Sequence, residues 1–511
     1  MGAIGGMLNR SIFIKNKYTF LYPAAIVFIG LMVAQLIATL QVYLSNAELY
    51  QTLFLLKSHG YFIVPNPLVM DQLCRFKPAF MGGLFFSFTI GAGVCIFTFG
   101  VVWSWLHILN KNKITGFVFV LIWATSIVAA NRKGFCPIVT LYFLIIPVLI
   151  SMIMMKWDKR SKRSIGSMKL WGPVFSIILL AILWTTQMSS SMFLDIRDNL
   201  LFSNAIGSAF NDFYYKYTLY PAGVFKSLDQ KMLKTCRLTI RGDKKTEITI
   251  EKLLLFQDYL RITDPKPVDL DISGQGDILV FYNERKPLLS TTCKAFMSDP
   301  NHFLEMVSLK TDRYGFFRQV TFIGLLVGFP LVLFIFIYSL LGFICSFFIG
   351  DKTASVLSSI LCVLIGISTF LIFNVNKSTL VDKIGIPSAL TSDRWQDRIS
   401  ALKTIIHYKI EINPTLTDPD IVNDPHIAVR YWLAKALAIS RKNETYPPIV
   451  SLLNDPQPNV VCMALEALAS RRDKNIIGLI IKKIETTDHW YIQWYAYRTL
   501  RKLGWTQTGS I

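Results

Sequence analysis

The sequence predicts a polytopic α-helical membrane protein with a small α+β module and a C-terminal stack of helical repeats. Two features of the composition support the membrane part. Hydrophobic residues make up 52% of the 511 residues and charged residues only 17%, whereas a soluble globular chain is about 25% charged. The apolar residues also gather in blocks, as they do in membrane proteins. The repeats are supported by the last quarter of the chain, which is more polar and self-similar.

Seven apolar runs approach the roughly 20 residues that a spanning helix needs. They are Thr19–Leu44, Pro78–Leu106, Ile114–Ala130, Gly134–Met155, Trp171–Met188, Val320–Ile349 and Ala354–Phe373. The first five predict an N-terminal membrane domain over residues 1–188, and the last two predict two further spans within residues 317–375. The first run is too long for the apolar part of a cleavable signal peptide, so we expect it to be retained.

Basic residues in the loops predict the orientation. The loop Lys156–Lys169 carries six basic side chains against one acid, Asp158, and such loops stay in the cytoplasm. Alternation then places the N-terminus in the cytoplasm and residues 189–316 and 376–511 outside, in the inner (plasma) membrane of a bacterium. The basic residues that agree are Arg10, Lys15, Lys17, Lys111 and Lys113, and those that disagree are Arg132 and Lys133. If Val320–Ile349 formed a re-entrant hairpin, residues 376–511 would instead face the cytoplasm.

The net charge of +20 favours anionic lipid headgroups over nucleic acid. Much of it lies in loops beside apolar runs, whereas a nucleic-acid site needs one basic face or arm. Ionisable groups are nearly absent from the spans, which argues against an ion-coupled transporter. Gly324 and Gly328 form a GxxxG pair that allows close helix packing. Packing within this chain and packing on another membrane subunit both remain open.

Residues 189–316 predict a small α+β module. It opens with Asp195–Tyr220, whose crowded aromatic residues predict a helix at the membrane surface. The strand-like segments are Arg237–Ile240, Val268–Ile272 and Ile278–Tyr282, and the helical ones are Ile250–Arg261 and Asn301–Lys310. The segment Asp269–Asp277 matches part of a calcium loop. Position twelve is Val280 where that loop needs Glu, so we expect a plain β-hairpin.

Residues 376–511 predict a domain of helical repeats. Asp424, Asp455 and Asp488 each open a similar segment and stand 31 and 33 residues apart. An aspartate at this place caps the start of a helix. The positions that recur are Asp424, Pro425, Val429, Arg430 and Ala434 in one segment, with Asp455, Pro456, Val460 and Ala464 in the next. A fainter copy covers Asp393–Ile406.

On these residues the chain resembles HEAT repeats, in particular the short kind found in phycobilin-lyase-like proteins. The match is partial, because Arg430 is replaced by Val461 and Trp494 in the later segments. The resemblance covers about the last quarter of the chain. It implies an α-solenoid whose curved surface binds a protein partner and is rarely catalytic.

The last segment carries most of the residues that we expect to contact a partner. Trp490, Trp494 and Arg498 are spaced four apart and therefore share one helical face. Tryptophan and arginine also dominate binding hot spots. Arg430 is the fourth candidate. The competing expectation is that this face packs on the chain's own outward module or on the membrane surface.

The eight cysteines contain no CxxC motif. Cys74, Cys136, Cys236 and Cys293 fall on the outward side, where disulfides are favoured. Cys74–Cys136 and Cys236–Cys293 are plausible pairs among three possible connectivities. No set of cysteines and histidines has the spacing of a zinc site, and only His107 lies in a span, which excludes a bis-histidine haem site there. We therefore predict no catalytic, cofactor-binding or metal-binding residue.

Taken with the repeats, these observations predict an integral membrane scaffold or accessory subunit that binds a protein partner. Membrane lipids are its other expected contacts. The alternative is a membrane enzyme or transporter, for example in thiol redox chemistry, with its site among the spans and outer loops. The low polarity within the spans favours the scaffold.

Overall fold

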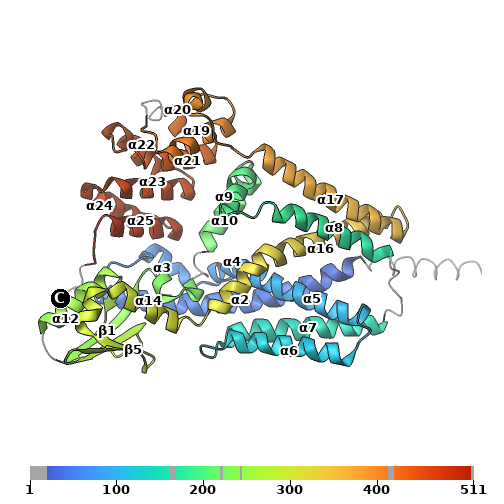
Figure 1. The fold of residues 1–511 in the computed structure, drawn as a ribbon, viewed down its shortest axis with the longest axis horizontal. Helices are drawn as coiled ribbons and strands as arrows, with labels where there is room; N and C mark the ends of the chain where they lie inside the picture. Colours follow the sequence, from blue (N-terminus) through green and yellow to red (C-terminus); the bar gives the residue numbers. More distant parts are fainter. Residues whose placement is uncertain (1–19, 161–167, 219–222, 242–243, 413–418, 508–511) are drawn as a thin grey trace, which may run out of the picture. The chain divides into compact units, whose positions relative to one another are not determined.

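The computed structural model describes residues 20–160, 168–218, 223–241, 244–412 and 419–507. These residues are mostly helical, with one small mixed sheet (Figure 1). They pack as two compact units, each assembled from three separate stretches of chain. The first unit comprises residues 1–41, 80–194 and 313–375, and the second comprises 42–79, 195–312 and 376–511.

Within the described residues, six helices are long and apolar enough to cross a membrane, because a helix satisfies its own backbone hydrogen bonds in lipid. They are α2 (Leu21–Ser58), α4–α5 (Phe76–Phe86 and Ala92–His107, joined by the π-helical turn η1, Ser87–Gly91), α6 (Lys113–Ala130), α7 (Pro137–Arg160), α15–α16 (Gly315–Ile323 and Phe329–Cys345, joined by η5, Gly324–Gly328) and α17 (Asp351–Val375). They confirm six of the seven predicted runs as apolar helices. The remaining run forms α8 (Met168–Thr185), whose apolar part is shorter.

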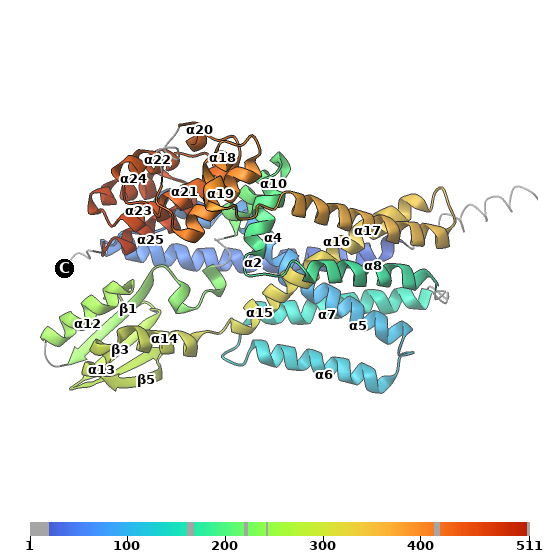
Figure 2. The ribbon, with the colours of Figure 1, turned by 45° about the horizontal axis from the view of Figure 1, so that its top comes forward.

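Small residues set the packing of the first unit. Gly328 lies so close to α5 that an added Cβ would meet the backbone nitrogen of Gly93 at 2.6 Å. A Cβ added at Gly324 would lie even closer to the carbonyl oxygen of Thr89. Both glycines therefore pack against this chain's own helix, as one of the two open alternatives expects. Contact with another membrane subunit stays untested. Figures 1 and 2 show α5, α6 and α7 side by side in the same unit.

Hydrogen bonds of polar side chains also join helices of the first unit. The hydroxyl of Ser87 donates to Gln35 Oε1 at 2.6 Å, and Gln35 Nε2 donates to the Phe80 carbonyl at 2.8 Å. The hydroxyl of Ser176 in α8 donates to the Ser359 carbonyl in α17 at 3.2 Å. The amide of Gln35 thus joins α2 to α4–α5, and α8 packs along α17.

The sheet of the second unit has five strands among the described residues, in the order β2-β1-β3-β4-β5. They are β1 (Lys234–Arg241), β2 (Tyr259–Arg261), β3 (Leu270–Gln275), β4 (Ile278–Asn283) and β5 (Lys286–Thr292), with the helices α12 (Lys244–Phe256), α13 (Cys293–Ser298) and α14 (Pro300–Thr311). Strand β1 is parallel to both neighbours, whereas β3, β4 and β5 pair antiparallel. The core between sheet and helices includes Ile250, Phe281 and Phe296.

The segment Asp269–Asp277 is a β-hairpin, as expected from its alternation. Its turn contains Gly276 with a φ of +62°, a conformation that favours glycine. The Asp269 carboxylate accepts hydrogen bonds from the backbone nitrogen and hydroxyl of Thr235 at 2.9 and 3.0 Å, and pairs with Lys231 at 2.7 Å. Asp269 therefore fastens β3 to β1.

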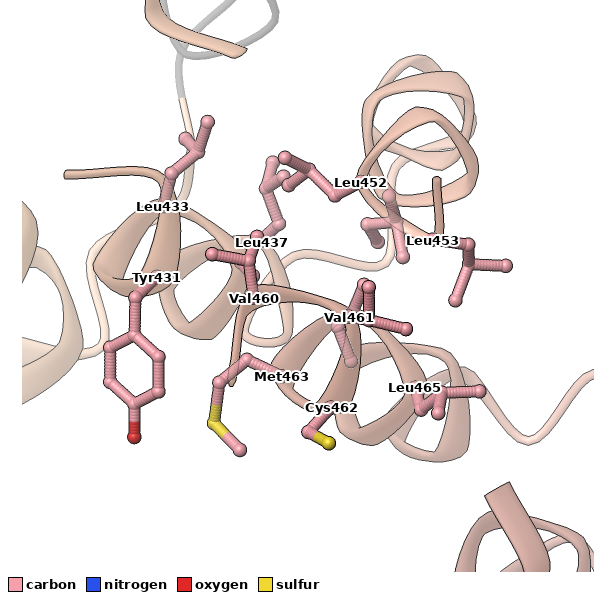
Figure 3. Close-up of a cluster of buried hydrophobic side chains, with 14 of the residues drawn as sticks. Tyr431, Leu433, Leu437, Leu452, Leu453, Val460, Val461, Cys462, Met463 and Leu465 are labelled. Carbon is pink, nitrogen blue, oxygen red and sulfur yellow. The ribbon is translucent and has the colours of Figure 1, made fainter. Parts of the chain in front are cut away.

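The C-terminal part of the second unit is a stack of helices, here called the helical stack. Its members are α18 (Ile386–Leu390), α19 (Trp395–Tyr408), α20 (Pro419–Val422), α21 (Ile427–Leu437), α22 (Tyr446–Leu452), α23 (Pro458–Arg471), α24 (Ile477–Thr486) and α25 (Trp490–Lys502). Helices α19, α21, α23 and α25 pack in succession, and one continuous apolar core runs through them. Figure 3 shows part of it, with Leu437, Leu452 and Leu465 pointing between the helices.

Candidate interaction surface of the helical stack

Two of the aspartates that open the repeated segments, Asp424 and Asp455, join successive helices. Asp424 and Asp455 each accept a hydrogen bond from the backbone two residues on, at 2.8 Å, an Asx turn that starts the next helix. Each also binds an arginine from the preceding segment. Arg398 pairs with Asp424 at 2.7 Å, and Arg430 pairs with Asp455 at 2.6 Å.

Arg430 is therefore occupied within the stack. It is only 9% exposed, and its second nitrogen donates to the Asp424 carbonyl at 2.6 Å. A guanidinium group held on two sides in this way clamps α21 to the segment that follows. The structure thus gives Arg430 a role within the stack, and partner binding by Arg430 stays a prediction. Val461, at the equivalent place in the next segment, makes no such clamp.

The predicted partner face of α25 is divided. Trp490 is 7% exposed and lies in an apolar cluster with Leu53 and Leu56 of α2 and Leu73 of α3 (Pro67–Leu73). Trp494 is half-buried against the same cluster. Arg498 is exposed, with its guanidinium carbon 4.5 Å from the Trp494 ring centroid. The same cluster includes Leu260 and Ile262, which belong to residues 189–316. Partner binding by Trp490, Trp494 and Arg498 stays a prediction.

Asn66 forms hydrogen bonds with the end of α24, with the turn that follows it and with α25. Its side-chain amide donates to the carbonyls of Ile484 and Thr487 at 2.8 and 3.0 Å, and its backbone nitrogen donates to Gln493 Oε1 at 2.9 Å. Asn66 also caps α3 by accepting from the backbone nitrogen of Val69. The apolar cluster around Trp490 keeps water away from these backbone and amide groups. The bonds to Asn66 give them the hydrogen-bond partners that buried polar groups need.

A second group of side chains meets on another face of the stack and is called here the Trp432 cluster. It comprises Arg197, Asp198, Lys403, Tyr431, Trp432 and Lys435. Arg197 and Asp198 belong to the π-helical turn η2 (Arg197–Leu201) and are 5% and 1% exposed. They pair at 2.7 Å, and the indole of Trp432 donates to Asp198 Oδ2 at 2.7 Å. A buried ion pair persists only when its remaining polar atoms are satisfied in this way.

Cations surround the aromatic rings of the Trp432 cluster. The guanidinium carbon of Arg197 lies 3.8 Å from the Tyr431 centroid, and the ammonium groups of Lys403 and Lys435 lie 4.8 and 4.6 Å from the Trp432 centroid. Burial lowers the pKa of both lysines, and the Asp198 carboxylate opposes that effect. The cluster holds the segment that contains η2 against α19 and α21.

Helix α10 (Ala205–Tyr217) continues this contact toward the end of the stack. Asn211 is 1% exposed, and its amide donates to Asn459 Oδ1 of α23 at 2.8 Å. The Tyr215 ring lies 4.5 Å from the Tyr491 ring of α25. One surface of the stack is therefore covered by residues 195–217 of the same chain.

The sheet holds two of the candidate disulfide cysteines apart. Cys236 lies in β1 and Cys293 directly follows β5, three strand spacings away. That separation is about 14 Å, whereas disulfide-bonded Cα atoms lie within about 7 Å. The predicted Cys236–Cys293 bond is therefore not formed, and all eight cysteines are free thiols. Burial raises the pKa of both thiols, which disfavours the reactive thiolate. Cys74 and Cys136 belong to different units.

The described residues contain no group of three or more His, Cys, Asp or Glu side chains placed to hold a metal ion. The chain matches no known family, no curated protein and no solved structure to which it was compared. Its function must therefore be inferred from the geometry of its own surfaces.

Proposed function

We propose that the protein is an integral membrane scaffold or accessory subunit that presents a HEAT-like helical stack to a protein partner. The observation that carries this proposal is that buried charged groups of the stack form ion pairs between its own structural elements. Arg398, Arg430 and the Arg197–Asp198 pair all join elements of the second unit to one another. Such an arrangement supports a rigid binding platform more than a reaction centre.

The two-unit organisation supports a membrane topology. The chain passes between the units after residues 41, 79, 194, 312 and 375. Because the second unit is one compact body, residues 42–79, 195–312 and 376–511 lie on one side of the membrane. The chain between residues 79 and 195 must then cross an even number of times. With α4–α5, α6 and α7 crossing, α8 must cross as the fourth. Its 18 residues extend about 27 Å, close to the 30 Å hydrocarbon core.

This gives seven spans, with the N-terminus opposite the second unit. The turn with Lys111 and Lys113 and the basic loop between α7 and α8 fall on the N-terminal side, which is therefore cytoplasmic. Part of that loop, residues 161–167, and the basic residues Arg10, Lys15 and Lys17 lie outside the described residues. The second unit faces outward. The same parity argument disfavours a re-entrant hairpin in α15–α16.

The partner surface is placed at one edge of the stack, here called the basic edge. It comprises the exposed residues Arg441, Lys442 and Arg472, which follow α21 and end α23. Arg471 donates to the Lys442 carbonyl at 3.0 Å, so the two helix ends are neighbours. Cations at helix C-termini are favoured by the helix dipole, and those that remain exposed suit a partner with an acidic surface.

The test compares two variants with the same loss of charge. Arg441→Gln, Lys442→Gln and Arg472→Gln together should release any protein that co-purifies with the full-length chain under mild detergent extraction. Lys244→Gln, Lys252→Gln and Lys294→Gln, which change exposed lysines around the sheet, should retain it. Equal retention of the same proteins by both variants would contradict the proposed surface.

A further inference from the structure

Helix α10 exposes apolar side chains and buries polar ones. Ile206, Phe210 and Tyr214 are 76%, 68% and 46% exposed, and their spacing of four places them along one face. On a flanking face of the same helix, Asn211 is buried against the stack. A helix packed on a globular core in water normally shows the reverse arrangement.

Several contacts fix the rotation of α10 about its own axis, because each would be lost if the helix turned. Asn204 caps it by accepting from the backbone nitrogen of Gly207 at 2.8 Å. Gly207 approaches the backbone of Leu201 so closely that a Cβ there would lie 2.7 Å from the Leu201 Cα. With the Asn211–Asn459 bond and the Tyr215–Tyr491 contact, these interactions keep the stripe of Ile206, Phe210 and Tyr214 turned outward.

The place of α10 in the chain and its residues indicate what covers the stripe. The helix begins 20 residues after Thr185, the end of α8. Because the proposed topology makes α8 a span, on which this step rests, the chain keeps α10 near the bilayer. The exposed residues among 205–217, all of which the structure describes, include Lys216 and no acid. Aliphatic and aromatic side chains flanked by a basic residue are typical of helices that lie in the membrane interface.

We propose that the stripe of Ile206, Phe210 and Tyr214 rests in the lipid headgroup region on the outward side of the membrane. Helix α10 is then bound on one face by the helical stack and on the other by lipid, and it anchors the stack to the bilayer surface. This inference does not depend on the existence of a protein partner, because it concerns a different surface from the basic edge.

The test places a photo-crosslinking residue on the stripe in the full-length protein. Phe210→p-benzoylphenylalanine and, separately, Ile206→p-benzoylphenylalanine would be irradiated in nanodiscs of phosphatidylcholine and phosphatidylglycerol. Both should yield adducts to lipid, detected by mass spectrometry. The control is Ile248→p-benzoylphenylalanine, at an isoleucine of α12 that is 45% exposed, and it should yield none.

Because both changes are at exposed positions, each variant should fold, which retention of the parent melting temperature would verify. Lipid adducts at neither stripe position, or at no higher level than at position 248, would overturn the proposal. Repeating the irradiation in native membranes separates the alternatives. A dominant crosslink to another protein at position 210 would show that the stripe is a protein interface and would also overturn it.

Discussion

Trp490 and Arg498 lie two turns apart on one helix but have opposite surroundings. Trp490 is enclosed by residues of α2 and α3, whereas Arg498 is exposed. The sequence predicts that they share a helical face, because that follows from local spacing. It does not predict that Leu53 and Leu73 cover one end of that face, since those residues are more than 400 positions away.

Replacing each of the two residues should separate their roles. Trp490→Ala should destabilise the second unit by about 3–5 kcal/mol, because it leaves a large cavity among packed leucines. Arg498→Ala, at an exposed position, should change stability by less than about 0.5 kcal/mol. Thermal unfolding followed by tryptophan fluorescence would measure both. A Trp490→Ala variant as stable as the parent would show that the cluster around Trp490 is not a core.

The elements of the fold were predictable to different degrees. The apolar runs predict the long helices, and the repeated segments that open with aspartate predict α21, α23 and α25. Both signals are local in the sequence. The sequence does not predict the strands β2 and β5 or the helix α3, since their formation depends on distant partners. Strand β2 lies within the expected helical segment Ile250–Arg261, whereas α12 ends at Phe256. Strand order was also unpredictable, and it is what separates Cys236 from Cys293. The Trp432 cluster joins residues over 230 positions apart, which no local pattern signals.

Two helices of the stack begin at a histidine whose burial in the folded protein favours the neutral form. His426 and His489 are the N-caps of α21 and α25, and Gln457 occupies the same place before α23. His426 stacks on Trp395 with ring centroids 4.0 Å apart. Burial lowers the pKa of each histidine to about 4. In the unfolded chain a histidine has a pKa of about 6.5, so there it binds a proton more readily.

The stack should therefore lose stability as the pH falls from about 6.5 toward 4. Over that range the unfolded state binds more protons than the folded state, so acid favours unfolding. At pH 4.5 each histidine should contribute roughly 2–3 kcal/mol to this loss. The double variant His426→Gln with His489→Gln places at both N-caps the residue that Gln457 supplies before α23. Its melting temperature should fall less between pH 7 and 4.5 than that of the parent. An unchanged decline in the double variant would show that other groups cause it.

At the scale of the whole molecule, the compact second unit constrains the topology more strongly than loop charges do. Loop charges leave the side of residues 376–511 open, because the turn between α16 and α17 offers only Asp351 and Lys352. The packing of those residues with 195–312 removes that freedom. Tyr497 of α25 donates to Asp258 at 2.6 Å, and Arg501 pairs with the same carboxylate at 3.1 Å. The sheet and the helical stack therefore belong to one compact unit, which the proposed topology keeps on one side of the membrane.

Single cysteines introduced at exposed positions would test this arrangement in intact cells. Gln275→Cys in β3 and Glu444→Cys in the stack should both react with a membrane-impermeant thiol reagent. Lys111→Cys, between α5 and α6, should react only after the cells are opened. The background would carry Cys74→Ser, because Cys74 is exposed and would itself react with the reagent. Labelling of Gln275→Cys but not of Glu444→Cys in intact cells would divide the second unit across the membrane. It would require an odd number of crossings between residues 312 and 376, so α15–α16 would form a re-entrant hairpin and α17 would cross alone.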